Sequence, residues 1–348
     1  MATSAETTVI ETHSGTLPDE WDNVVTNHDR ATVFHTRAWK QTVDRTFNYD
    51  PAYVVVSDDE TGDTIGVVPS FRVGETVGES FVNPFCEYGY PLVATDADPR
   101  RVLSALTTLP GRFDAIICKD RYGTDIRGYY PEFGAIKTGV SFRVPTTIAF
   151  DTLWENGFNR DLRSSIRTAR DHDLTVTETD DVAAYFELYR QTMDRLGSPI
   201  FPQSFFDTLK STFGSDCRIL LVDEDSPKAG LLVLDFGGDR YILSNASDPT
   251  HWDERPNELL YCTVIEWACD GEYSVVDFGR TEPESPLYEF KQKFGGTEKQ
   301  LASFVHPPRY VSRASISGYK QLKPVTRRLG PLLTHPRVGP TLKEWVHE

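Results

Sequence analysis

The sequence predicts an α/β protein of two tandem domains. The chain has 348 residues, more than a single hydrophobic core usually serves, and its 39% hydrophobic and 12% aromatic content is enough for two packed interiors. The order helix, helix, strand, acidic turn, strand also occurs twice, at an offset of about 165 residues. We therefore expect one domain over residues 1–148, a second over 149–306, and a tail over 307–348.

The first half of the sequence alternates between the hydrophobic pattern of helices and that of strands. Apolar residues recur three and four positions apart in its helical segments, and β-branched runs flanked by turn residues mark its strands. The predicted helices are 17–28, 36–47 and 98–109, and the predicted strands are 52–57, 64–72, 114–119 and 142–150.

The second half repeats this order. Its predicted helices are 153–172, 181–197, 202–213, 257–269 and 285–294, and its predicted strands are 218–223, 231–236, 240–246, 274–278 and 299–306. Pro256 suits a first helical position, and Gly271 predicts a left-handed end to the helix 257–269.

Four arginines are spaced along the helix predicted at 153–172. Arg160, Arg163, Arg167 and Arg170 follow the 3-4-3 rhythm of one helical face. They could pair with the nearby Asp161, Asp171 and Asp173 or with the neighbouring domain. Alternatively, they could clamp a phosphate or carboxylate, to which arginine offers a planar fork of donors.

The charge balance is strongly acidic. The chain has 52 acidic against 36 basic residues, a formal net charge of −16, and only 11 of the basic residues are lysine. This composition predicts a protein from a salt-in halophilic archaeon; the alternative is an ordinary acidic mesophilic protein. The predicted tail differs, since eight basic and two acidic residues give it a net charge of +6. We expect the tail to dock on the acidic body, with a peripheral membrane contact as the alternative.

An acidic, lysine-poor surface predicts a fold that gains stability from salt. Repulsion among the carboxylates extends further at low ionic strength and is screened within ~3 Å at 1 M salt. We expect the melting temperature to rise across a KCl series into the molar range. A melting temperature that stays flat or falls with added KCl would contradict the halophilic interpretation.

Several classes of protein are disfavoured. The first residues have neither the basic nor the apolar region of a secretory signal, and no stretch approaches the roughly 18 apolar residues of a membrane span, so we expect a cytoplasmic protein. The five cysteines are scattered without a CxxC pair, which argues against a disulfide framework, a zinc site or a thiol nucleophile. We expect no metal.

The segment 275–296, VVDFGRTEPESPLYEFKQKFGG, is the most informative. An apolar strand ends in Asp277, Gly279 and Arg280, and a short helix with Tyr288 and Lys291 follows. Open α/β sheets bind ligands at the carboxyl ends of their strands, so this segment indicates a site for an anionic or acyl-bearing substrate. The alternative is a buried strand followed by a solvated helix. The DFG triplet alone does not indicate a kinase, because the other kinase motifs are missing.

This segment, with the preceding helix PNELLYCTVIEWACDG, resembles the FemAB-type branch of the GNAT acyltransferases. RDLRSSIRTARDH resembles the arginine-rich helix that opens the second domain of that family, and FVNPFCEYGYPLV resembles its Tyr-Gly loop. The resemblance covers about residues 30–305. It implies two tandem GNAT-like domains, each a twisted mixed sheet flanked by helices.

The resemblance also implies an activity. It predicts transfer of an acyl or aminoacyl group to an amine or hydroxyl of a glycan- or lipid-linked acceptor, with acyl-CoA or aminoacyl-tRNA as the donor. The choice of donor stays open, because the loop that holds the CoA pyrophosphate in ordinary GNAT enzymes reads DERPNELL here, without glycine.

The family pattern and the residue types suggest roles for individual side chains. Lys291 would stabilise charge in the transition state, Arg280 would bind a phosphate, and Asp277 would accept a proton or orient Arg280. The predicted substrate-binding residues are Arg163, Arg167, Tyr88, Gly89, Asn245 and Tyr288. We expect Lys291, Arg280, Arg163 or Arg167 and Tyr88 to face one cleft, and Lys291→Met to lower turnover with little effect on folding.

Two other functions remain possible. A tandem GNAT-like fold could act as a non-catalytic scaffold that binds a surface-glycan precursor or a partner protein. A nucleic-acid binder could use the tail and the arginine-rich helix, although the net charge of −16 argues against broad affinity for phosphate backbones. We expect no DNA partner. The sequence leaves the donor, the acceptor and the oligomeric state open.

Overall fold

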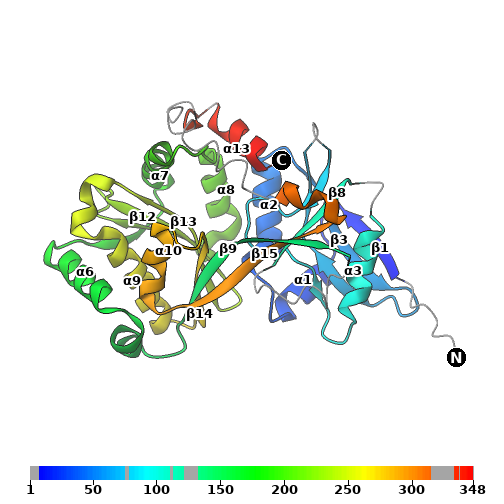
Figure 1. Ribbon diagram of the computed structural model, residues 1–348, viewed down its shortest axis with the longest axis horizontal. Coiled ribbons are helices and arrows are strands. Elements are labelled where there is room, and N and C mark those ends of the chain that lie inside the picture. The colour runs from blue at the N-terminus through cyan, green and yellow to red at the C-terminus, as the bar shows by residue number, and fades with distance from the viewer. Residues whose placement is uncertain are drawn as a thin grey trace. The chain divides into compact units, whose positions relative to one another are not determined.

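The structure is a computed structural model of the chain. It describes residues 8–74, 78–109, 113–120, 132–314, 333–336 and 338–347. Within these residues the elements are α-helices, short helical turns and fifteen β-strands (Figure 1).

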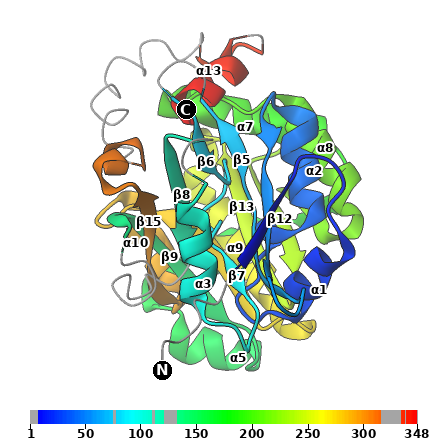
Figure 2. The same cartoon turned by 90° about the vertical axis from the view of Figure 1, so that its right-hand side faces the viewer.

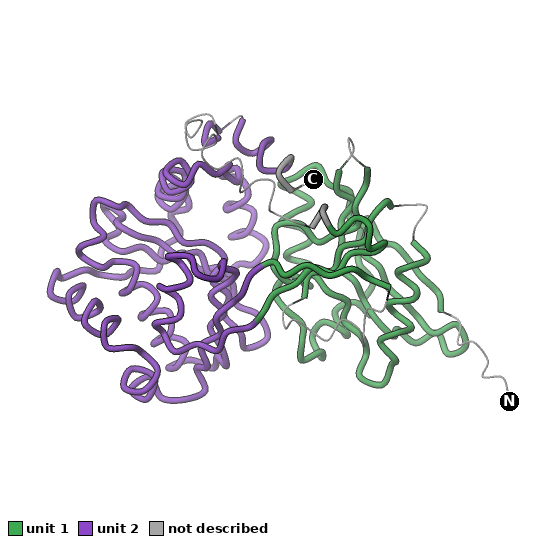
Figure 3. The backbone as a smooth tube through the Cα atoms, in the orientation of Figure 1, with its two compact units in different colours: residues 1–138, 300–316, 347–348 green, residues 139–299, 317–346 purple. Residues whose placement is uncertain are grey.

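The chain forms two compact units (Figure 3). Unit 1 comprises residues 1–138, 300–316 and 347–348, and unit 2 comprises residues 139–299 and 317–346. The division falls inside a strand on both sides, at 138/139 in β9 (Gly134–Pro145) and at 299/300 in β15 (Thr297–His306). It therefore differs from the sequence-based division at 148/149 and gives residues 300–306 to unit 1.

Unit 1 contains two groups of strands. The first has the order β1-β3-β4-β7 and the second the order β15-β8-β6-β5-β2. The strands are β1 (Thr8–His13), β2 (Asp50–Pro51), β3 (Tyr53–Asp58), β4 (Thr64–Val68), β5 (Phe71–Val73), β6 (Ser80–Val82), β7 (Leu92–Val93) and β8 (Ala115–Asp120). The helices are α1 (Asp19–Asn27), α2 (Arg37–Thr46) and α3 (Pro99–Thr107), which Figure 2 turns toward the viewer.

Unit 2 is one mixed sheet in the order β10-β11-β12-β13-β14-β9. The strands are β10 (Val176–Thr179), β11 (Cys217–Val222), β12 (Ala229–Phe236), β13 (Asp239–Ser247) and β14 (Val275–Thr281). The helices are α5 (Phe150–Thr152), α6 (Arg160–Asp171), α7 (Val182–Leu196), α8 (Gln203–Phe213), α9 (Pro256–Asp270) and α10 (Pro286–Lys291).

Helices cover both faces of the unit 2 sheet. Alternate strand residues such as Leu231 and Val233 pack with α6 and α9 in one continuous core, which also takes in Phe278 of β14. The helices α7 and α8 contact β11, and α7 also contacts β12 and β13. Because both faces are covered, β12 is buried along nearly its whole length, as an apolar central strand should be.

The two halves repeat the same order of elements. The helices α7 and α8 and the strands β11 and β12 begin 163 to 166 residues after α1, α2, β3 and β4. In each half a further strand, β1 or β10, pairs antiparallel with the first strand of the hairpin. The predicted repeat is thus present as secondary structure.

The last strand of each half joins the other half's unit. β9 ends the first half but pairs antiparallel with β14 of unit 2, while β15 ends the second half and pairs antiparallel with β8 of unit 1. This exchange explains why the division into units falls inside β9 and β15.

The structure corrects three predicted elements. The helix predicted over 153–172 is interrupted, because residues 153–157 form a π-helical turn and the Asn159 side chain caps α6 by accepting a hydrogen bond from the Leu162 amide. Gly271 is extended, with φ −95°, and not left-handed. The strand predicted over 142–150 lies earlier, as β9, and Phe150 begins α5.

The described part of the tail packs on unit 2. Leu333 and Thr334 are buried, and the ammonium of Lys343 in α13 (Gly339–His347) lies 4.5 Å from the centre of the Phe201 ring. Residues 315–332, which belong to the same predicted tail, lie outside the described residues. Among the helices that the structure describes, none is long and apolar enough to cross a membrane.

Candidate functional site

The parallel strands β13 and β14 are paired only at their amino ends. Asp239, Arg240 and Tyr241 pair with Val275, Val276 and Asp277, and the pairing stops there. β13 continues to Ser247 along β12, whereas β14 continues along β9 after a register shift. The carboxyl ends of two parallel strands are therefore unpaired with each other, which is where an open α/β sheet offers main-chain groups to a ligand.

A bulge reshapes β14 at this point. The register against β9 shifts between Asp277 and Arg280, so the strand does not stop at the Gly-Arg step as predicted but runs on to Thr281. Gly279 has φ +64°, a conformation that glycine adopts without the steric penalty of a Cβ. The amide of Gly279 donates to Oδ1 of Asp277 at 2.9 Å, which fixes the turn of the chain.

Lys291 holds the bulge from the end of α10. Its side chain is buried, and Nζ donates to the carbonyl oxygens of Phe278 at 2.5 Å, Gly279 at 3.1 Å and Arg280 at 3.2 Å. In a regular strand successive carbonyls point to opposite sides, so three consecutive carbonyls converge on one ammonium only because the bulge turns the chain. The structure thus gives Lys291 a main-chain positioning contact that the sequence did not indicate.

Asp277 lies at the centre of a buried polar network. It has no exposed surface, and its Oδ1 accepts a hydrogen bond from Oγ of Ser141 at 2.6 Å. Its Oδ2 lies 3.5 Å from Nε of Arg143, whose Nη2 donates to Asp239 at 2.5 Å. This network joins β9, β13 and β14, and burial in it suits Asp277 to a positioning role better than to direct proton transfer with a substrate.

The amino end of α9 faces the unpaired part of β13. Asn245 of β13 donates through Nδ2 to Oδ1 of Asn257 at 3.2 Å and to the Gly230 carbonyl at 3.4 Å. Glu258, in the first turn of α9, is mostly buried, and burial raises the pKa of its carboxyl group. Arg255 and Lys293 act in the opposite direction on that pKa.

The remaining predicted residues of unit 2 lie on α6, β14 and α10. Nη1 of Arg163 donates to the carbonyls of residues 154, 155 and 158 at 2.8–2.9 Å, and the guanidinium of Arg167 lies 5.8 Å from the Trp154 ring centre. The Tyr288 hydroxyl donates to Glu298 at 2.6 Å, which raises the tyrosine pKa. Arg280 is partly exposed and lies 3.9 Å from Glu282.

Tyr88 and Gly89 belong to unit 1. Tyr88 is buried and its ring packs 5.7 Å from that of Phe34, and Gly89 forms a bridge with Lys119. The role of Tyr88 and Gly89 in binding stays a prediction.

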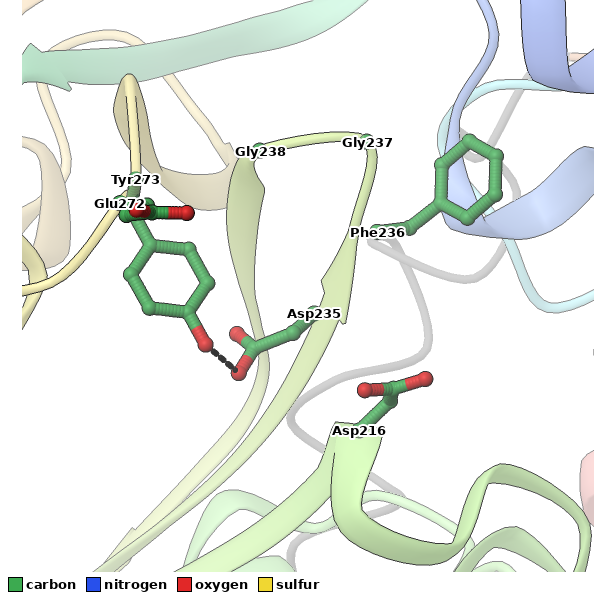
Figure 4. Close-up of a pocket in the computed structure, with 7 residues that line it drawn as sticks. All are labelled: Asp216, Asp235, Phe236, Gly237, Gly238, Glu272 and Tyr273. Carbon is green, nitrogen blue, oxygen red and sulfur yellow. Dashed lines mark hydrogen bonds between the residues drawn. The ribbon is translucent and has the colours of Figure 1, made fainter.

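A pocket of about 370 Å³ opens at the other end of the parallel strand pair (Figure 4). It is lined by Asp216, Asp235, Phe236, Gly237, Gly238, Glu272 and Tyr273, and by none of the predicted site residues. It lies where β13 and β14 begin, not where they end. Its three carboxylates disfavour an anionic donor, so we do not place the transfer site there.

All five cysteines lie within the described residues, and neither a thiol nucleophile nor a metal site is indicated among those residues. All five cysteines are free, and burial raises the pKa of Cys217 and Cys262 to about 12, well above the range that would supply a thiolate nucleophile at neutral pH. Among the residues that the structure describes, no group of three or more His, Cys, Asp or Glu side chains is arranged to hold a metal ion.

Comparison with known proteins identifies the fold. A family model described as an acetyltransferase (GNAT) domain matches residues 156–292. FemX superposes with a TM-score of 0.65 at 16% identity, over 90% of this chain and 100% of that chain. The fold is a tandem GNAT fold.

Two further solved structures share it. A C-terminal domain assigned to lysylphosphatidylglycerol synthetase from Agrobacterium fabrum gives a TM-score of 0.57 at 13% identity, over 87% of this chain and 96% of that chain. A tandem GNAT protein from the clavulanic acid biosynthesis pathway gives 0.53 at 10% identity, over 86% and 98%. No curated protein matches at the level of sequence. At these identities the likeness concerns the fold.

The GNAT fold raises the question of an acyl-CoA donor, and the amino end of α9 does not fit its pyrophosphate. Arg255, the residue before the helix, has φ +64°, and Pro256 has no amide hydrogen to offer. The preceding residues 249–255 contain no glycine. Glu258 places a carboxyl group in the first turn of α9. A pyrophosphate bound there would need amide donors and positive charge, so this carboxyl group would repel it.

Sequence reasoning missed the residues that support the site from a distance. Ser141 and Arg143 lie 136 and 134 residues before Asp277 in the chain, on a strand that the first half contributes to unit 2. No local motif predicts that exchange. Glu258 could have been noticed, because an acidic residue two positions after Pro256 stands at the start of a helix where ordinary GNAT enzymes have a glycine-rich loop.

The bulge in β14 predicts a strong requirement for glycine at position 279. A Cβ there would lie 3.0 Å from the Ile242 carbonyl oxygen, in addition to the strain of a positive φ. We expect Gly279→Ala to destabilise the fold by about 1–3 kcal/mol in urea unfolding. Gly62→Ala is the matched control, since Gly62 also has a positive φ but a Cβ there would meet nothing within 4 Å. Equal losses in the two variants would show that the close approach to β13 has no energetic role.

Proposed function

We propose that the protein is an acyltransferase that moves an acyl or aminoacyl group to an amine or hydroxyl of a glycan- or lipid-linked acceptor. The observation that carries the proposal is the GNAT fold with its parallel strands β13 and β14, whose carboxyl ends are not paired with each other. Main-chain amides on this edge of β13 are suited to hold a donor carbonyl and to stabilise the oxyanion that forms when the acceptor attacks.

The side chains around the bulge would support this chemistry. Lys291 would fix the carbonyls of residues 278–280 and place a positive charge behind the bulge. Asp277 would keep the bulge in shape through the Gly279 amide, and Arg280 would bind a phosphate of the donor or acceptor. Asn245 would orient the donor from β13. Tyr288 and the unit 1 residues Tyr88 and Gly89 remain proposed substrate contacts.

We propose that the donor is an aminoacyl ester carried by RNA and not an acyl-CoA. The reason is the misfit of the α9 amino end with a pyrophosphate, described above.

A direct assay would compare the two donor classes. The purified protein would be incubated with a lipid extract of its host and either radiolabelled aminoacyl-tRNA or radiolabelled acetyl-CoA. We expect label to enter the lipid-linked fraction from the aminoacyl-tRNA. Mass spectrometry of surface glycans from the wild type and a deletion strain gives the in vivo counterpart, in which we expect the deletion to lose an acyl or aminoacyl mass increment. Unchanged glycans together with no transfer from either donor would refute the proposal.

One observation favours the scaffold alternative. Lys291 and Asp277 are buried and bonded to groups within unit 2, as they would be if the site had kept its architecture without its chemistry. A scaffold would bind the glycan precursor in equilibrium dialysis without releasing free donor carrier. Single-turnover release of uncharged tRNA, in the presence of acceptor, would rule this alternative out.

A further inference from the structure

The hydroxyl of Tyr185 in α7 is buried without a hydrogen-bond partner. Tyr185 has no exposed surface, and in the part of the chain that the structure describes nothing forms a hydrogen bond with its hydroxyl. Burying a hydroxyl that makes no hydrogen bond costs folding free energy, because the hydroxyl loses water and gains nothing in exchange. Buried hydroxyls nearly always have a partner in native proteins, so this one indicates a role other than stabilising the fold.

The ring of Tyr185 lies on the sheet face that α7 covers. A Cβ at Gly230 of β12 would lie 3.0 Å from Cδ2 of Tyr185, so the glycine leaves room for the ring. Leu231 points into the core with α6 and α9, so its neighbour Leu232 points to the α7 side. Ser244 of β13 is opposite Leu232 in the register of the two strands, and its side chain therefore shares the α7 side with Tyr185.

The helix α7 and the strand β13 run alongside each other at matching spacing. Oγ1 of Thr192 accepts a hydrogen bond from the Ser247 amide at 3.0 Å and donates to the Ser247 carbonyl at 3.3 Å. The helix covers about 10 Å between Tyr185 and Thr192, and the strand covers about 10 Å between Ser244 and Ser247. Tyr185 is thus placed over Ser244.

The electrostatics of the phenol agree with this placement. Burial raises the pKa of the Tyr185 hydroxyl well above its usual range, and the Ser244 side chain acts on that pKa in the opposite direction. Ser244 is therefore near the hydroxyl, although the two form no hydrogen bond in the structure. With its pKa raised, the phenol keeps its hydrogen at neutral pH and is a donor that has no acceptor.

Ser244 lies in the unpaired part of β13. The pairing with β14 ends at Tyr241, and Ser244, three residues later, is partly exposed. The next residue, Asn245, is bonded to Asn257 at the amino end of α9. The unpaired edge of β13 therefore has an amide pair on its α9 side and the hydroxyls of Tyr185 and Ser244 on its α7 side.

A ligand at this edge would satisfy both hydroxyls at once. A serine hydroxyl has one hydrogen to donate and two lone pairs that accept. When the hydrogen of Ser244 points to a ligand, its oxygen is available to accept the hydrogen of Tyr185. Each of the two hydrogen bonds then polarises the other, which makes Ser244 a stronger donor to the ligand.

We propose that Tyr185 is a positioning residue of the transfer reaction, whose hydroxyl donates to Oγ of Ser244 and so directs the Ser244 hydrogen to the acyl oxygen of the donor. The inference rests on the proposed function. In the transfer, the acyl carbon gains a bond to the acceptor nitrogen or oxygen and loses its bond to the donor oxygen or sulfur, and one proton passes from the acceptor to the leaving atom. Ser244 stabilises the negative charge on the acyl oxygen beside the main-chain amides of β13, and Tyr185 acts only through Ser244.

Tyr185→Phe tests this role because it removes the hydroxyl and keeps the ring. The assay is the radiolabelled transfer described above, with the donor that the wild type uses varied at a fixed amount of lipid extract. We expect kcat to fall by about tenfold while KM for the donor stays within about twofold. We also expect the variant to unfold at a higher urea concentration than the wild type, because it no longer buries an unpaired hydroxyl. A purely structural tyrosine would not combine a gain in stability with a loss in kcat.

A second variant tests whether Tyr185 acts through Ser244. Ser244→Ala should lower kcat by about 10²-fold, as for other lost oxyanion donors. Adding Tyr185→Phe to Ser244→Ala should change kcat by no more than about twofold, since the group that Tyr185 orients is already gone. Effects that multiply in the double variant would mean that the two residues act independently, and would overturn the proposal.

Tyr53→Phe is the matched control. Tyr53 is also fully buried with an unpartnered hydroxyl, but it lies on β3 of unit 1, which pairs with β1 on one side and β4 on the other. We expect Tyr53→Phe to raise stability and to leave kcat within about twofold of the wild type. An equal fall in kcat in both variants would show that the loss is not specific to Tyr185.

The outcomes separate this inference from the proposed function. If the wild type transfers label and Tyr185→Phe transfers it equally fast, the positioning role is wrong and the transferase stands. If Tyr185→Phe unfolds at a lower urea concentration than the wild type, the hydroxyl already has a partner in solution, such as a buried water, and the inference fails. If the wild type transfers label from neither donor, the proposed function is refuted and the role of Tyr185 in it falls as well.

Discussion

Replacing Lys291 by methionine is expected to destabilise unit 2 as well as to abolish most activity. The substitution keeps the length of the side chain but removes the ammonium that three consecutive carbonyls share. A hydrogen bond to a charged group contributes about 1.5–3 kcal/mol, and a buried acceptor left without a partner costs about 1–3 kcal/mol. We expect a loss of about 2–4 kcal/mol in the free energy of unfolding, read from urea curves followed by circular dichroism.

This expectation differs from the one that the sequence alone supports. Sequence reasoning places the Lys291 charge at the reacting centre and predicts a loss of turnover of about 10²–10³ with folding little changed. Burial against the β14 main chain adds the structural cost. The contacts of the Lys291 ammonium would then also shape the site, because relaxation of the bulge would move the carboxyl end of β14.

Lys137→Met is the matched control. Lys137 lies on β9 with an exposed side chain, so the same chemical change should leave unfolding within about 0.5 kcal/mol of the wild type. If Lys291→Met unfolds at the same urea concentration as the wild type and as Lys137→Met, the carbonyl contacts do not stabilise the bulge. A Lys291→Met variant that keeps wild-type activity would show that the Lys291 charge has no role in the transfer.

The sequence predicted the elements of the fold well where local pattern decides them. The repeat of α1, α2, β3 and β4 in α7, α8, β11 and β12 follows from hydrophobic period and turn residues, which depend on neighbours in the chain. The tandem GNAT fold followed from the resemblance. The exchange of β9 and β15 could not be predicted, because a terminal strand can complete either sheet with the same apolar face and only the tertiary pairing decides.

The sequence indicates which segment to consider as the candidate site, and it does not indicate how the side chains of that segment are held. The segment from Asp277 to Lys291 does gather at the carboxyl end of β14, as expected for a ligand-binding edge. What the side chains contact depends on a bulge, and a bulge needs only one glycine and one extra residue to form. The arginines of α6 lie along one side of the helix, as their spacing indicates.

Replacing Asp277 is expected to have the second large effect. Asp277 is fully buried and accepts from Ser141 Oγ and from the Gly279 amide, with Arg143 Nε at 3.5 Å. Asp277→Ala would leave two donors without an acceptor and the Arg143 guanidinium with Asp239 as its remaining carboxylate. Breaking a buried charged network from one side costs about 3–5 kcal/mol, and we expect a loss in that range.

Asp277→Asn removes the negative charge of the side chain but keeps its shape. The amide oxygen can still accept from one donor, but the amide nitrogen must face Arg143 or Ser141 in place of a carboxylate oxygen. We expect an intermediate loss of about 1–3 kcal/mol, since one hydrogen bond survives and the ion pair does not. Asp225→Asn is the matched control, an exposed position where the same change should stay within about 0.5 kcal/mol.

A double-mutant cycle that combines Ser141→Ala with Asp277→Ala tests whether the exchanged strand β9 holds the bulge in β14. The 2.6 Å hydrogen bond from Ser141 to Asp277 joins β9 to β14, so the two substitutions should not be additive. We expect a coupling free energy of about 1–2 kcal/mol, with the double variant less damaged than the sum of the single variants. Additive losses would mean that Ser141 and Asp277 stabilise the protein independently, and that the strand donated by the first half does not shape the end of β14 through this bond.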